Sequence, residues 1–142
     1  IVDVGAKPVV PREATASGFL ALRTETIDAV RTGQVLKGDV VQASTIAAIQ
    51  AVKDTPRIVP HCHPIPLTAC DVDWSVEDTG IRCIVRVRAE WKTGVEMEAL
   101  TGVCAGLLCA WDMVKSLEKD EHGQYPEARM GDICVLEKIK GE

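Results

Sequence analysis

Alternating apolar and polar residues predict a β-hairpin in the middle of this chain. Every second residue is apolar from Cys70 to Val76 and again from Ile81 to Trp91, and the turn EDTG separates the two runs. A period of two is typical of strands buried on one face, so two antiparallel strands are expected. The other face of the second strand carries three arginines and is interpreted as solvated: Arg82, Arg86 and Arg88.

The apolar period changes to three or four between Val95 and about Lys119, which predicts a long helix. Gly102 and Gly106 lie on one flank of this helix. Because glycine otherwise weakens a helix, another backbone is expected to pack closely there. Apolar residues between positions 133 and 139 predict a final strand.

The first half of the chain is expected to be mainly helical. Residues 1–12 predict an extended arm, part of which can add an edge strand. Thr15 or Ser17 is expected to cap a helix that ends at Gly33, and a second helix is expected over about Val41 to Lys53. These elements indicate an α+β fold in one domain, residues 1–142, with helices on one face of a sheet.

The composition excludes several classes of protein. With 46% hydrophobic and 26% charged residues, the chain has enough apolar surface to form a core, so disorder is excluded. The net charge of −5 argues against a nucleic-acid binder. The longest uncharged apolar stretch, Ala99 to Trp111, is shorter than the roughly 20 residues that a membrane span requires.

Six cysteines form no CxxC pair and no spaced quartet of metal ligands. No leader sequence is evident, so the expectation is a cytoplasmic protein with reduced thiols. Four of the cysteines have apolar neighbours and are expected to behave as small hydrophobic residues: Cys70, Cys83, Cys104 and Cys109.

The segment Pro60–Pro64, PHCHP, holds two of the three histidines. In an extended segment His61 and His63 would point to one side and Cys62 to the other. A catalytic imidazole, a metal pair and a rigid loop whose histidines cap backbone groups all fit this pattern. Zinc is disfavoured because no further Cys/His cluster supplies the three or four ligands that it needs.

Two glutamates, Glu96 and Glu98, stand where the long helix begins. Carboxylates are favoured there by the helix dipole alone. Residues two apart point in opposite directions, however, so one glutamate should face the core or a partner chain. A partly buried carboxylate has a raised pKa, which suits acid–base chemistry.

A third group, Asp112 and Lys115, lies near the end of the same helix and is either a surface ion pair or a functional pair. Glu98 and Asp112 lie about 21 Å apart at 1.5 Å per residue, so they cannot meet in one small pocket on one chain. If both groups are catalytic, the pocket lies between subunits.

A fourth group is the turn Lys37-Gly38-Asp39, which leads into the second helix. With Arg12 and the free helix start it can hold phosphates, although a solvated turn lysine fits equally well.

Five motifs in order, VDVGAK, KGDV, HCHPIPLT, KTGVEMEALT and AWDMVK, resemble the MoaC family of molybdenum cofactor biosynthesis, the cyclic pyranopterin monophosphate synthases. The resemblance runs from about Val2 to Lys138. It implies a ferredoxin-like antiparallel sheet with helices on one face plus an extra N-terminal helix. It also implies a homohexamer, a trimer of dimers, with active sites at subunit interfaces.

The implied activity is that of a lyase. It would convert 3′,8-cyclo-7,8-dihydro-GTP, supplied by a radical-SAM enzyme, to cyclic pyranopterin monophosphate with release of pyrophosphate. No cofactor is implied, although Mg²⁺ can accompany the triphosphate. The motifs imply two sets of site residues. The catalytic set is Asp112, Lys115, Lys37, Glu96 and Glu98; the substrate-binding set is Arg12, Lys53, Cys62, His63, Met97 and Lys138.

Two other functions remain open from the residues. A zinc-dependent hydrolase or deaminase would use His61, Cys62 and His63. A scaffold module would use the conspicuous glutamates and lysines only to pair across interfaces.

Overall fold

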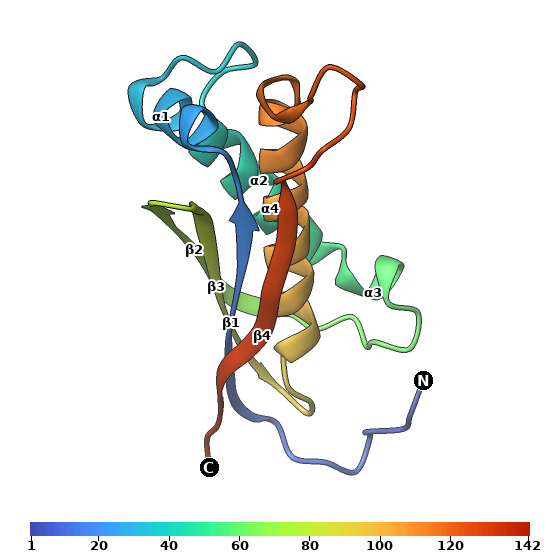
Figure 1. The fold of residues 1–142 in the computed structure, drawn as a ribbon. Helices are drawn as coiled ribbons and strands as arrows, with labels where there is room; N and C mark the ends of the chain where they lie inside the picture. The colour runs from blue at the N-terminus through green and yellow to red at the C-terminus, as the bar shows by residue number, and fades with distance from the viewer.

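The computed structural model describes residues 1–142 (Figure 1). Four strands and four helices follow residues 1–9, which have no regular structure. In chain order the elements are β1 (Val10–Ala21), α1 (Thr24–Thr32), α2 (Val40–Lys53), α3 (Thr55–Ile58), β2 (Leu67–Glu77), β3 (Gly80–Trp91), α4 (Glu96–Glu118) and β4 (Arg129–Lys140).

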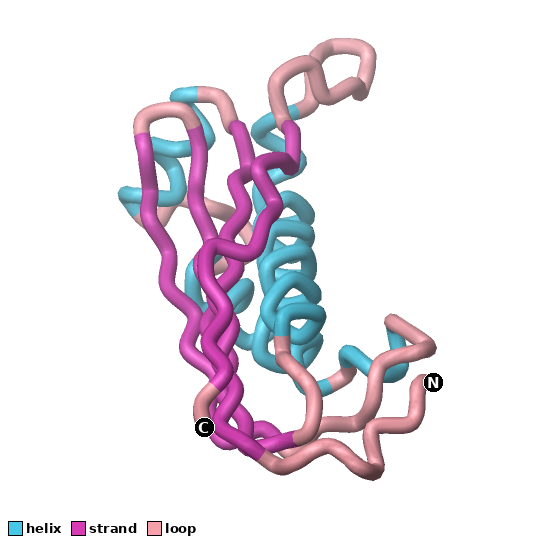
Figure 2. Tube along the Cα trace, turned by 90° about the horizontal axis from the view of Figure 1, so that it is seen from below, coloured by secondary structure: helices cyan, strands magenta, loops and turns pink.

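The four strands form one antiparallel sheet in the order β2-β3-β1-β4. This order, with helices between β1 and β2 and between β3 and β4, is that of a ferredoxin-like fold, and α1 is the extra N-terminal helix. Figure 2 shows the helices gathered on one side of the sheet. The α+β, ferredoxin-like prediction is confirmed.

The core lies between the sheet and the antiparallel pair α2 and α4. The small residues Gly102 and Gly106 allow this close approach. A Cβ at Gly102 would lie 2.6 Å from a Val52 methyl group, and one at Gly106 would lie 3.4 Å from the Ala48 Cβ. The expected close approach of another backbone is confirmed at Gly102, where a Cβ would lie 3.4 Å from the Ala48 carbonyl oxygen, whereas side chains of Trp74 and Ala48 pack against Gly106.

The predicted helix capped by Thr15 or Ser17 is wrong. Residues 10–21 form β1, which lies between β3 and β4 and is not an edge strand. Thr15 and Ser17 are buried within it because pairing on both sides covers the backbone. The helix begins only at Thr24 and ends, as expected, at Gly33, whose φ of 71° is left-handed.

Cys104 also differs from expectation, because it is exposed on α4, whereas Cys83 is fully buried. The helix that carries Cys104 has the length and apolar composition of a membrane-crossing helix, although no uncharged stretch in the sequence is that long. Its packing explains this composition: α4 is the central helix of the core and contacts β1, β3, β4 and α2.

Candidate active site

A pocket of about 230 Å³ lies where α4 begins. The loop after α3 forms one side of it, and the turn between β3 and α4 forms another. All of His61, Cys62 and His63 line the pocket, together with Glu96, Met97 and Glu98. The expectation that Cys62 points away from the histidines is wrong, because these residues form a turn and not an extended strand.

Glu98 is the buried carboxylate of this pocket, with only 3% of its surface exposed. Burial raises its pKa, and the negative charge of Glu96 raises it further, against hydrogen bonding to its own main chain, which lowers it. No cation pairs with Glu98. The same region raises the pKa of the Cys62 thiol, through burial first and the Glu98 charge second. Glu98 is thus suited to holding or releasing a proton.

The pKa of Glu96 shifts in the opposite direction from that of Glu98, in keeping with side chains two residues apart that point to opposite sides of a helix. Lys138 Nζ on β4 lies 2.5 Å from Glu96 Oε1. Burial acts to raise the Glu96 pKa, but the Lys138 hydrogen bond and the charges of Lys138 and Arg12 outweigh it, so the pKa is lowered. Gly94 lets the Glu96 carboxylate fold back, since a Cβ there would lie 2.8 Å from Glu96 Oε1.

Arg12 joins this group from β1, where it pairs with Ala89 and Lys140 of the neighbouring strands. Its Nη2 donates to the Lys92 carbonyl at 3.2 Å, and its Nε is buried without a partner. Arg12 therefore places a positive charge near the Glu96 carboxylate. We call this set of residues the Glu98 cluster: Arg12, Cys62, His63, Glu96, Met97, Glu98 and Lys138.

A second group, the Asp112 cluster, consists of Lys37, Asp112 and Lys115 at the other end of α4. Lys37 Nζ and Lys115 Nζ each lie 3.0 Å from an Asp112 oxygen. Hydrogen bonds and charges from both lysines lower the Asp112 pKa. In return, Asp112 raises the Lys115 pKa. The three side chains, two lysines and one aspartate, together carry one surplus positive charge at neutral pH.

An apolar pocket of about 310 Å³ adjoins the Asp112 cluster and is lined by Leu108, Trp111 and Met130 besides Asp112 and Lys115. Trp111 is held edge to face against Tyr125, with ring centroids 5.6 Å apart. A flat, anionic ligand would find apolar surface and cations side by side here.

The structure thus brings ten of the eleven predicted site residues into two clusters at opposite ends of α4. Lys53, at the end of α2, is exposed and forms no ion pair or hydrogen bond. Sequence reasoning did not assign roles to Val2, Thr93 or Gly94, which also line the first pocket. The only signal for them was their place within the two motifs VDVGAK and KTGVEMEALT.

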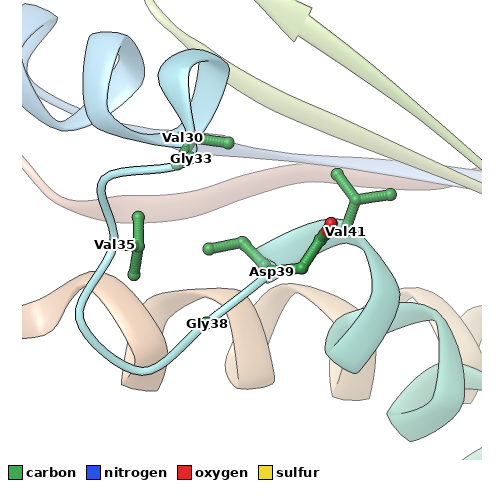
Figure 3. Close-up of a pocket in the computed structure, with 7 residues that line it drawn as sticks. Val30, Gly33, Val35, Gly38, Asp39 and Val41 are labelled. Carbon is green, nitrogen blue, oxygen red and sulfur yellow. The ribbon is translucent and has the colours of Figure 1, made fainter.

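A separate pocket of about 290 Å³ lies between the end of α1 and the start of α2 (Figure 3). Valines and glycines dominate its lining, and its one charged residue, Asp39, caps α2 by accepting from the Gln42 amide at 3.0 Å. This pocket offers no acid–base pair. Nowhere does the chain gather three His, Cys, Asp or Glu side chains in a metal-binding arrangement.

Comparison with known proteins decides the family. The model of the MoaC family matches residues 1–141, which is nearly the whole chain. This chain belongs to the MoaC family. Its motifs HCHPIPLT and KTGVEMEALT supply most of the lining of the pocket at the start of α4, and VDVGAK supplies Val2.

Curated MoaC relatives cover the chain from end to end. A probable cyclic pyranopterin monophosphate synthase of Thermococcus kodakarensis is 54% identical over all 142 residues, which span 91% of that protein. A protein of Pyrococcus abyssi with the same name is 54% identical over 99% of this chain and 88% of its own length. A probable cyclic pyranopterin monophosphate synthase accessory protein of Methanothermobacter thermautotrophicus is 54% identical over 100% of this chain and 89% of its own length.

Proposed function

We propose that this protein is a cyclic pyranopterin monophosphate synthase of molybdenum cofactor biosynthesis. The full-length match to the MoaC family and the names of relatives at 54% identity support this activity. Synthases of this name are lyases, so the chain is an enzyme. One structural observation carries the proposal to individual residues: the polar residues of the family motifs gather into two clusters with complementary acid–base and cationic groups.

The proposed substrate is 3′,8-cyclo-7,8-dihydro-GTP, and the products are cyclic pyranopterin monophosphate and pyrophosphate. In the last step a sugar hydroxyl attacks the α-phosphorus. A new P–O bond forms, the bond to pyrophosphate breaks, and pyrophosphate leaves with the electron pair. A base takes the proton of the hydroxyl, and nearby cations stabilise the leaving charge.

Acid–base work falls to Asp112 with Lys115, assisted by Glu96 or Glu98. The ion pair keeps Lys115 protonated and Asp112 ionised, which are the forms that donate and accept a proton, but both pKa shifts weaken the transfer until the substrate separates the two groups. The buried Glu98 supplies a second proton site of raised pKa.

Phosphate binding falls to the cations Arg12, Lys37 and Lys138, with the His63 ring as a further ligand-binding group and Lys53 from the end of α2. Cys62 and Met97 line the pocket at the start of α4 and would contact the ring system.

Assembly of subunits would complete the site. Each chain carries one cluster at each end of α4, too far apart to share one ligand. Leu108 and Met97 are 62% and 42% exposed on this helix, and Cys104 is exposed between them, so an apolar stripe joins the two clusters. A homohexamer built as a trimer of dimers, with sites at subunit interfaces, would cover it.

Three further features belong to the proposal. The substrate would come from a radical-SAM enzyme, and neither nucleic acid nor membrane takes part. No organic cofactor is needed, and Mg²⁺ can accompany the triphosphate. Residues 1–142 would act as one domain in the cytoplasm.

The deciding experiment supplies purified protein with 3′,8-cyclo-7,8-dihydro-GTP in the presence of a chelator. Pyrophosphate and the oxidised, fluorescent pterin product are measured together. Equal amounts of both support the synthase proposal. If folded protein releases neither product, with Mg²⁺ or Zn²⁺ making no difference, the synthase proposal fails. The double variant Asp112→Ala/Lys115→Ala separates the enzyme from the scaffold alternative. An enzyme would lose turnover and keep its oligomeric assembly, whereas a scaffold would lose the assembly itself.

A further inference from the structure

Residues 2–7 form an N-terminal arm without regular structure, and its first residue lines the pocket at the start of α4. Figures 1 and 2 show this N-terminal arm leaving the start of β1, passing below the beginning of α4 and ending beneath α3. We use the name "arm" for residues 2–7 only. Val2 at its far end is one of the residues that line the pocket.

Two hydrogen bonds hold the arm to the body of the protein. The Val2 carbonyl lies 2.7 Å from His63 Nε2, and the Gly5 carbonyl accepts from Lys92 Nζ at 2.7 Å. Between them, the Asp3 carboxylate accepts from the Gly5 amide at 2.7 Å, and the Lys7 amide donates to the Val4 carbonyl at 3.0 Å. The arm therefore has an internal turn, Val4–Lys7, which is held at Gly5 within the turn and at Val2 before it.

Lys92 connects the arm to the two other elements of the same site. Its side chain holds Gly5, while its own carbonyl accepts from Arg12 Nη2 at 3.2 Å. The next residues in the chain, Thr93 and Gly94, line the pocket. One lysine thus joins the arm, β1 and the turn before α4.

We propose that the arm is a wall of the substrate pocket and that Lys92 is a positioning residue that holds it there. This inference rests on the proposed synthase function for its kinetic part. Lys92 acts on the arm and on Arg12, and the arm in turn fixes the His63 ring through the Val2 carbonyl. Without the bond to Gly5, the arm leaves the pocket open on one side and the His63 ring loses a restraint.

The test replaces Lys92 with Met, which keeps the length and apolar stem of the side chain and removes the donor. Hydrogen exchange of the arm is measured by mass spectrometry, and KM and kcat are measured with 3′,8-cyclo-7,8-dihydro-GTP. Lys92→Met should speed exchange at residues 4–7. It should raise KM about five- to tenfold with kcat changed less than about twofold, since one charged hydrogen bond used for positioning is lost.

Two controls accompany it. Lys92→Arg keeps a charged donor and should restore both the exchange rate and KM. Lys119→Met removes an exposed lysine that follows α4, lies outside the arm and forms no ion pair or side-chain hydrogen bond, and it should behave as the wild type.

Unchanged exchange in Lys92→Met would overturn the inference. A lower KM would also overturn it, because the arm would then compete with the substrate. If the wild type shows no turnover, the proposed function fails, whereas the exchange measurement still decides whether Lys92 holds the arm.

Discussion

Lys37 and Asp112 lie 75 residues apart in the chain, yet Lys37 Nζ contacts Asp112 twice. It lies 3.0 Å from Oδ2 and donates to the main-chain carbonyl at 3.1 Å. The antiparallel packing of α2 against α4 creates this contact, because the turn before α2 then meets the end of α4. Lys115 approaches the other carboxylate oxygen one turn later on the same helix. Lys37 of the KGDV motif thereby contacts Asp112 of the AWDMVK motif, which also holds Lys115.

The first prediction concerns the pH dependence of this cluster. Asp112 raises the pKa of Lys115, so Lys115 keeps its proton to higher pH than an ordinary lysine. Asp112→Asn removes that effect and lowers the Lys115 pKa. Asp112 is itself the proposed base, so kcat at pH 7 should fall at least about a hundredfold. If Lys115 acts as the acid, the alkaline limb of the residual rate should also move to lower pH.

A pH–rate profile from pH 6 to 11 checks this prediction. Asp28→Asn is the control, since Asp28 is exposed on α1 and forms no ion pair. An alkaline limb that stays in place would separate Lys115 from the proton transfer.

The second prediction tests whether one site draws on two chains. Glu98→Gln and Asp112→Asn variants should each be inactive. When the two are unfolded together and reassembled in equal amounts, half of the dimers are mixed, and each mixed dimer contains one intact site. Activity should therefore return to about a quarter of the wild-type value. No recovery, in mixtures proved by mass spectrometry to contain mixed assemblies, would place the whole site on a single chain.

The third prediction concerns the stability cost of Glu98. Burial raises its pKa in the folded state, so folding is favoured when Glu98 is protonated. The contribution of Glu98 to the free energy of unfolding is fully present below the ordinary glutamate pKa of the unfolded chain. It is lost as the pH rises from that value through the raised pKa of the folded state. Glu98→Gln should therefore raise Tm relative to the wild type at pH 7, and by less at pH 4. It should also abolish turnover.

Thermal unfolding at both pH values, with Glu90→Gln as an exposed control, measures this difference. The prediction would be contradicted if the gain in Tm from Glu98→Gln were smaller at pH 7 than at pH 4.

The fourth prediction concerns Glu118, which is fully buried at the end of α4. Its carboxylate accepts from the Arg23 amide at 3.0 Å and from the Thr26 hydroxyl, and so caps the start of α1, which has no side-chain cap of its own. Glu118→Ala leaves both donors without partners. We expect a loss of about 2–3 kcal/mol in the free energy of unfolding.

Urea unfolding measures this loss, and Glu121→Ala is the matched control because Glu121 is exposed and three residues away. In Glu118→Ala, the backbone amides of Thr26 and Ile27, the two buried residues of α1, should also exchange hydrogen faster than in the wild type. Equal stability of the two variants would contradict the capping role.

The sequence predicted several elements from local patterns alone. The hairpin of β2 and β3 followed from strict alternation, and α4 followed from its apolar period. The close approach at Gly102 also followed, because glycine in a helix has few other uses. The motifs were sufficient to name the family, since each motif is a contiguous segment, whereas the roles of the candidate site residues stay predictions.

Only the tertiary structure decided where β1 lies and which site residues meet. Residues 14–20 are small or apolar without a clear period. Pairing with β3 and β4 covers both edges of β1, α4 covers one face, and Thr15 and Ser17 on the other face are also buried, so a local pattern did not distinguish strand from helix. The contacts of Lys37 with Asp112 and of Lys138 with Glu96 join elements that are distant in the chain. Such contacts depend on how helices and strands pack, whereas periodicity reports only which face of each element is buried.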